Sequence, residues 1–122
     1  MQSQTKSWYC MDNLKTLREI CNILDVTRRA VQGYEKAGLV APSERNKYGY
    51  LLYNEIEQER IKKIKLYQQF GFKLKEIKDL IDAPEYVVKE AVERQVSKLK
   101  SEITRLSTLI DRAEGLIEEF IK

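Results

Sequence analysis

The feature that most limits how this chain can fold is an apolar repeat along its last third. Apolar residues recur there at alternating steps of four and three, which places them on one stripe of a coiled-coil helix. The stripe consists of Val92, Val96, Leu99, Ile103, Leu106, Ile110, Ala113, Ile117 and Phe120. A helix from Pro84 to about Ile121 would be somewhat over ~50 Å long. An exposed apolar stripe of that length is untenable in a monomer, so the repeat predicts a dimer interface.

The two core positions of this repeat differ in shape. One position carries only β-branched residues, from Val96 to Ile117, and the other carries mostly leucine-like residues. This combination favours a coiled coil of two helices. Leu109 and Leu116 widen the stripe towards its end. We expect them to pack against a further surface, with a hydrophobic effector site as the alternative.

A second organised stretch runs from Thr16 to Tyr53. Thr16 and Glu19 have the spacing of a capping box, which predicts a helix starting just after Thr16. Its apolar positions fall at i, i+3, i+4 and i+7, on one helical face: Leu17, Ile20, Cys21 and Leu24. After a short break, Thr27 can cap a second helix, in which Val31 and Tyr34 face the first. Gly38 supplies a left-handed end to this second helix.

The second helix and the segment after it carry groups suited to DNA. Two short helices at a sharp angle form the unit that enters a major groove. Arginine can bind guanine through two hydrogen bonds and glutamine can bind adenine in the same way, so we expect contacts from Arg28, Arg29 and Gln32. Asn46 to Gly49 is rich in turn formers and predicts a two-stranded wing. The charged and phenolic side chains of this wing are suited to a phosphate backbone: Arg45, Lys47, Tyr48 and Tyr50.

Taken together, these residues resemble the winged helix-turn-helix of the MerR family of bacterial transcription regulators. The resemblance rests on Val26, Thr27, Tyr34, Glu35, Gly38, Leu39, Val40, Pro42, Arg45, Tyr48, Gly49, Tyr50 and Tyr53, and continues from Leu14 to Lys122. It implies a mainly α fold: a winged helix-turn-helix with a small β-hairpin wing, then a long C-terminal coiled-coil helix in antiparallel pairs. It also implies that Thr27 and Tyr34 join the DNA-binding set.

Two positions depart from the family pattern. The family has Arg-Tyr-Tyr or Arg-Phe-Tyr where this chain has Gln32-Gly33-Tyr34, and an arginine where this chain has Leu51. Glycine inside a helix also costs up to about 1 kcal/mol relative to alanine. Three functions therefore compete: a dimeric regulator reading a pseudo-palindromic operator, an architectural or excisionase-like DNA binder, and a coiled-coil interaction protein that has lost DNA binding.

The resemblance divides the chain into three parts: an N-terminal tail (1–13), a winged helix-turn-helix domain (14–83) and a dimerisation helix (84–122). Within the domain we expect a helix opened by Asn54 and Glu57, with an apolar side formed by Ile56, Ile61, Ile64, Tyr67 and Phe70. Its lysines, Lys62, Lys63 and Lys65, are predicted to form a solvated face. Gly71 should end this helix, and a further one should carry Ile77, Leu80 and Ile81.

Composition limits the remaining possibilities. Of the net charge of +3, residues 1–54 contribute +3, with 8 Lys/Arg against 5 Asp/Glu, so the positive excess lies on the predicted DNA-binding part. The two cysteines, Cys10 and Cys21, form no disulfide framework. There is no signal peptide and no apolar run of transmembrane length, so we expect a cytoplasmic protein without a membrane partner.

Catalysis and metal binding are not expected. The chain has no histidine, no cysteine beyond Cys21 and no glycine-rich phosphate loop, so we expect neither an enzyme, nor a metal site, nor a cofactor. Neither the metal-sensing cysteines nor the large drug-binding domain found in some family members is expected here. Beyond DNA and a second copy of the chain, the resemblance leaves RNA polymerase and an unknown small-molecule effector open as partners.

Overall fold

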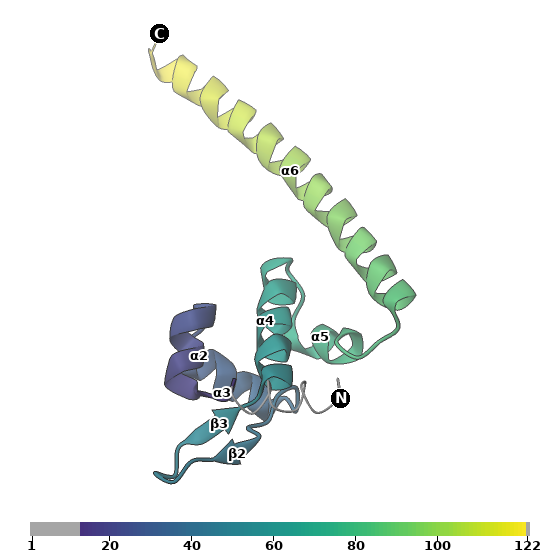
Figure 1. Ribbon diagram of the computed structural model, residues 1–122. Helices are drawn as coiled ribbons and strands as arrows, with labels where there is room; N and C mark the ends of the chain where they lie inside the picture. Colours follow the sequence, from purple (N-terminus) through teal and green to yellow (C-terminus); the bar gives the residue numbers. More distant parts are fainter. Residues whose placement is uncertain (1–12, 122) are drawn as a thin grey trace. The chain divides into compact units, whose positions relative to one another are not determined.

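The computed structural model describes residues 13–121 and is mainly helical, with a small sheet (Figure 1). The elements are β1 (Lys15–Thr16), α2 (Leu17–Leu24), α3 (Arg28–Lys36), β2 (Glu44–Arg45), β3 (Leu51–Tyr53), α4 (Glu55–Gln69), α5 (Leu74–Leu80) and α6 (Glu85–Ile121). They form two compact units, one ending at Asp82, called the head below, and one beginning at Ala83. The predicted tail, apart from Asn13, lies outside the described residues.

The first two helices begin as the sequence predicts. The Thr16 side chain accepts a hydrogen bond from the Glu19 N–H at 3.2 Å, and the Glu19 carboxylate accepts one from the Thr16 N–H at 3.0 Å, which completes the capping box. Thr27 accepts from the Ala30 N–H at 3.0 Å and opens α3. Each oxygen satisfies an N–H that has no partner within its own helix. Asp25 joins the two helices in the left-handed conformation, with φ of 53°.

Two glycines end helices in the head. At the end of α3, Gly38 has φ of 78°, its N–H donates to the Glu35 carbonyl, and the Leu39 N–H donates to the Tyr34 carbonyl. Gly71 repeats this arrangement after α4, with φ of 106°. A positive φ costs glycine little because it has no Cβ, and the paired hydrogen bonds satisfy the last carbonyls of each helix.

The sheet has one strand more than predicted. β3 lies in the centre of the sheet, and both neighbouring strands run antiparallel to it. In β2, Arg45 lies opposite Leu51, and in β1, Thr16 lies opposite Leu52. β1 has only two residues and shows no alternation of apolar and polar side chains, so its sequence gave no strand signal. Its pairing attaches the start of α2 to the wing strand.

The head has one apolar core, drawn from its helices and the central strand. Its largest fully buried side chains are Tyr53, Ile20, Ile61, Ile64, Ile77 and Val31. At about 25 cal/mol per Å² of apolar area, burying each aliphatic side chain contributes roughly 1.5–3 kcal/mol. One predicted core residue is wrong: Ile56, in the first turn of α4, is 65% exposed.

Lys65 does not belong to a solvated lysine face. Its ammonium group donates to the backbone carbonyl of Leu24 at 2.9 Å and also binds the carbonyl of Asp25. The side chain is therefore partly buried and caps the C-terminus of α2, where the helix dipole favours a positive charge.

Replacing Lys65 with methionine should lower the stability of the head. Because the cap includes charge-assisted hydrogen bonds, we expect a loss of about 1–2 kcal/mol in the free energy of unfolding, measured by urea denaturation. Lys62→Met, which removes the same charge from an exposed position of α4, is the matched control and should change stability by less than about 0.5 kcal/mol. Equal effects of the two substitutions would contradict the capping role.

The second unit is the single helix α6, which covers Glu85–Ile121. The repeat residues from Val96 to Phe120 are exposed in this single chain, with Leu106 46% and Ile103 67% exposed. Within α6, Arg105 forms an ion pair with Glu102, three residues earlier. No helix among residues 13–121 is long and apolar enough to cross a membrane.

Candidate nucleic-acid interface

The exposed face of α3 is a stripe of polar side chains. Arg29, Gln32, Gly33 and Lys36 follow one another at i, i+3, i+4 and i+7, on the side of the helix opposite the buried Val31 and Tyr34. Arg29, Gln32 and Lys36 are all exposed. We call these four residues the α3 stripe. It holds two positive charges and one amide, which can donate to phosphates and to base edges.

Arg28 lies beside this stripe rather than in it. The side chain is exposed at the first position of α3. Arg28 is seven residues before Glu35, whose carboxylate accepts a hydrogen bond from Tyr53 of the central strand, so Arg28 lies on the flank of α3 that faces this strand. Of the two predicted arginines, Arg29 points away from the head and Arg28 points towards the strand side.

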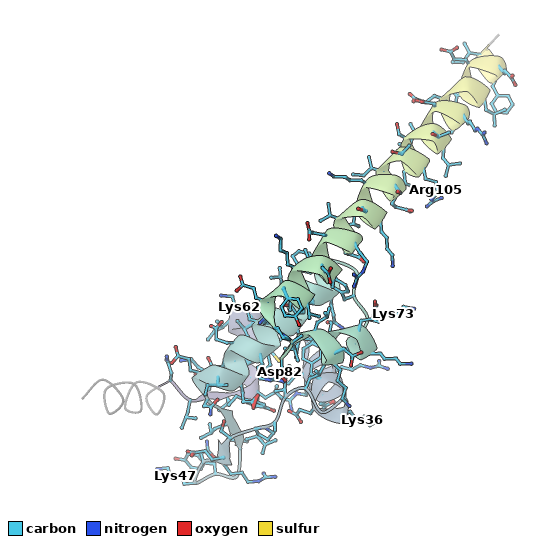
Figure 2. The ribbon with its side chains drawn as sticks, turned by 90° about the vertical axis from the view of Figure 1, so that its right-hand side faces the viewer. Lys36, Lys47, Lys62, Lys73, Asp82 and Arg105 are labelled. Carbon is cyan, nitrogen blue, oxygen red and sulfur yellow. The ribbon has the colours of Figure 1, made fainter. Side chains whose placement is uncertain are left out.

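Lys36 was missed by sequence reasoning. It ends α3 one turn beyond Gly33 and extends from the head in Figure 2. Its place could have been found from the seven-residue spacing to Arg29, which returns a helix to the same face. Thr27 is exposed, but its hydroxyl already accepts the capping hydrogen bond from Ala30.

Tyr34 was wrongly placed among the DNA-binding residues. Its side chain is 2% exposed, and its hydroxyl donates to Gln68 Oε1 on α4 at 2.7 Å. Burial also raises the pKa of this hydroxyl. The aromatic ring packs in the core, so a duplex has no access to it. Tyr34 instead fixes α3 against α4, and thereby orients the stripe on the opposite face.

The wing is held in shape by Asn46. Its side-chain oxygen accepts hydrogen bonds from the N–H groups of Tyr48 at 2.9 Å and Tyr50 at 3.0 Å. The backbone closes the turn as Asn46 accepts from Gly49 and donates to Tyr50. Gly49 has φ of 83°, a conformation that other residues adopt only with strain. The tip is therefore a defined turn, closed by its own side-chain and backbone hydrogen bonds.

The four predicted wing residues share this exposed hairpin. The Arg45 guanidinium donates to the Gly49 carbonyl at 2.7 Å, so part of its hydrogen-bonding capacity is used in shaping the wing. The Lys47 ammonium lies 5.1 Å from the ring centre of Tyr48, and Figure 2 shows Lys47 at the wing's tip. Tyr48 and Tyr50 are 71% and 64% exposed. Cationic and phenolic groups thus gather on one projecting element, as a phosphate-contacting wing requires.

A buried hydrogen bond ties the wing strand to α3. Tyr53, the last residue of β3, is fully buried and donates its hydroxyl proton to the Glu35 carboxylate on α3. Desolvation first, and then the bond to Glu35, raises the pKa of this hydroxyl well above its ordinary value. The two elements that carry the candidate interface are therefore joined through the core.

Replacing Tyr53 with phenylalanine should destabilise the head by about 1.5–3 kcal/mol at neutral pH, since the hydrogen bond to a carboxylate is lost. A folded-state pKa above the unfolded value of about 10 gives stability that is present below pH 10 and is lost as the pH rises further. We therefore expect the difference between wild type and Tyr53→Phe to be constant between about pH 7 and 9 and to shrink above it. Urea unfolding at each pH measures this, and a difference that grows with pH would contradict the arrangement.

The seam residues predicted for the dimer lie on the separate α6 unit. All of them are exposed apart from Val92, which is half-buried. Leu109 and Leu116 are also exposed, at 45% and 51%. Among residues 13–121, no group of three or more Asp, Glu, Cys or His side chains could hold a metal ion.

Comparisons with known proteins agree with this geometry. Residues 15–84 match the model of the MerR HTH family regulatory proteins, and residues 58–116 match a model described as MerR, DNA binding. The HTH-type transcriptional activator mta of Bacillus subtilis is 30% identical over 94 residues, which cover 77% of this chain but only 37% of that relative. The chain thus spans little more than a third of its curated relative's length.

Solved structures show the same architecture. A MerR-family transcriptional regulator from Bacillus cereus superposes with a TM-score of 0.77 at 26% identity, over 89% of this chain and 84% of that one. HiNmlR, a MerR-family regulator lacking the sensor domain, was solved bound to promoter DNA. It superposes with a TM-score of 0.62, over 80% of this chain and 79% of its own. At 19% identity, this second likeness concerns the fold alone.

Proposed function

Because this chain belongs to the MerR family of helix-turn-helix regulators, we propose that it is a dimeric, sequence-specific DNA-binding transcription regulator. The observation that carries the proposal is the α3 stripe, whose exposed cations and amide lie on the same unit as a structured, projecting wing. A helix with such a face reads base edges in the major groove, while the wing contacts the neighbouring phosphates.

The division of labour in this proposal follows the two units. The winged helix-turn-helix domain, residues 14–83, binds DNA, and the helix of residues 84–122 holds two copies together through its apolar seam. Two heads related by a two-fold axis require two half-sites, so the operator is a pseudo-palindrome. Promoter DNA is the proposed site, because the relative mta is a transcriptional activator. RNA polymerase is a further proposed partner, because it binds at promoters.

Selection of bound duplexes from a random pool tests the proposal directly. We expect one enriched motif with two inverted half-sites, and an affinity that falls steeply with salt because the cations of the interface displace counterions from phosphates. A pool with no enriched motif would contradict sequence-specific regulation.

The competing functions give different results in the same assays. A coiled-coil interaction protein, the reading favoured by Gln32 and Leu51 in place of the family arginines, would bind duplexes weakly or with a flat salt response. An architectural binder would bind DNA but leave no footprint between promoter elements. A footprint between the elements of a promoter that carries the selected motif would separate the regulator from both.

A further inference from the structure

Gly33 lies at the centre of the α3 stripe, and the fold gives no reason for a glycine there. Its backbone is that of an ordinary helical residue, unlike Gly38 and Gly49, whose φ angles are positive. A Cβ added to Gly33 would meet no atom within 4 Å. Glycine is nevertheless the poorest helix former apart from proline, so the helix would be more stable with alanine at this position.

The neighbours of Gly33 show what this open space faces. Arg29 lies one turn before it and Lys36 one turn after it on the same outer face, and both side chains are exposed. Because no atom lies within 4 Å of the Cβ position of Gly33, the space above the backbone between these two basic residues is open. Its floor is the helix backbone itself, so a surface that fits the stripe can approach the backbone most closely at Gly33.

We propose that Gly33 is a specificity-determining contact, at which the backbone of α3 receives the C5-methyl group of a thymine in the operator. This inference rests on the proposed function. In the major groove the thymine methyl is the apolar group that projects towards a bound helix, and it tells T·A from the other base pairs. A methyl group fills the space that a side chain at residue 33 would occupy, while Arg29 and Lys36 bind the polar groups beside it.

The test exchanges one methyl group between the protein and the DNA. Gly33→Ala adds a methyl group to the helix, and deoxyuridine in place of thymidine removes one from the groove. On the operator selected by the wild type, Gly33→Ala should weaken binding by about tenfold or more, since a clash at one base pair is worth about that ratio. Replacing symmetry-related thymidines of the two half-sites together by deoxyuridine, one pair at a time, should restore its affinity to within about threefold for one such pair.

Gly115→Ala is the matched control. Gly115 is a glycine of α6 whose added Cβ also meets no atom within 4 Å, so the substitution has the same effect on helix propensity in the other unit. Both alanine variants should raise the Tm by a few degrees, and Gly115→Ala should leave DNA affinity unchanged. The raised Tm shows that any loss of binding by Gly33→Ala is not a loss of folding.

Two results would overturn the inference while leaving the proposed function intact. In the first, the wild type binds its selected operator and Gly33→Ala binds it equally well. In the second, Gly33→Ala binds more weakly but no deoxyuridine restores its affinity. A wild type that selects no duplex at all would instead defeat the proposed function, and the inference with it.

Discussion

Replacing Leu106 with lysine should convert the proposed dimer to monomers. Leu106 lies in the middle of the apolar seam of α6, and 46% of its side chain is exposed in the single chain. A two-fold dimer buries it twice, so the substitution removes two leucines from the interface and forces two ammonium groups against apolar surface. Each leucine lost from a packed interface costs about 2–5 kcal/mol, which raises the dissociation constant by about a thousandfold or more.

Sedimentation velocity at micromolar concentration measures this change directly. Thr108→Lys is the control, because it places the same charge two residues away, on the side of α6 opposite the seam. The control should remain a dimer, and both variants should keep the helical circular dichroism of the head. If Leu106→Lys remains dimeric at the same concentration, α6 associates through another face.

The second large effect is expected from the two arginines of α3. The Arg28→Ala, Arg29→Ala double variant should lose specific DNA binding, by about a hundredfold or more in affinity for the selected operator, because each well-placed arginine contact is worth about 1–3 kcal/mol. Binding isotherms measure the loss. Sedimentation should show the same oligomeric state as the wild type, because the proposed dimer seam lies on the other unit.

The single variants distinguish the roles of the two arginines. Arg29 belongs to the α3 stripe, whereas Arg28 lies on the flank of α3 that carries Glu35, the partner of Tyr53, so Arg29→Ala should account for most of the change in sequence preference. Arg112→Ala removes the same charge from the exposed surface of α6 and controls for the general loss of positive charge. If affinity for the operator survives the double substitution, the α3 stripe is not the contact surface.

The parts of the fold that the sequence predicts best are those governed by neighbouring residues. The capping box of Thr16 and Glu19, the cap at Thr27 and the turns at Gly38 and Gly71 depend on residues three to five positions apart, and the structure confirms them. The long α6 follows from a strict apolar period in the same way. In each case, interactions between residues close together in the sequence are sufficient to predict the element.

The parts that sequence reasoning missed depend on residues far apart in the chain. Lys65 reaches carbonyls about forty positions away, and the two-residue β1 exists only because β3 is beside it. The Asn54 cap shows both kinds of contact: its side chain accepts from Glu57 as predicted, but its N–H donates to Ser43 on the wing side. Contacts between residues far apart in the chain cannot be predicted from the spacing of neighbouring residues.

The candidate site shows the same division. Periodicity predicts that α3 has an outward face and that Tyr34 faces the first helix, and it was the family resemblance that placed Tyr34 among the DNA-binding residues. In the structure the Tyr34 hydroxyl donates a hydrogen bond to Gln68 on α4, so the Tyr34 side chain lies in the core. The exposure of Arg45, Lys47, Tyr48 and Tyr50 follows from the turn that Asn46 organises, and the turn residues did predict that hairpin.

One side chain of α4 joins two distant points of the head. The Arg60 guanidinium donates to the Leu39 carbonyl, just beyond the end of α3, at 2.8 Å. It also binds both carboxylate oxygens of Asp82, at 2.7 and 3.3 Å, and holds the pKa of that carboxyl below its usual value. Asp82 is the last residue of the head before the chain enters the second unit. One guanidinium therefore holds both the segment that follows the candidate DNA-binding helix and the residue at which the chain leaves the head.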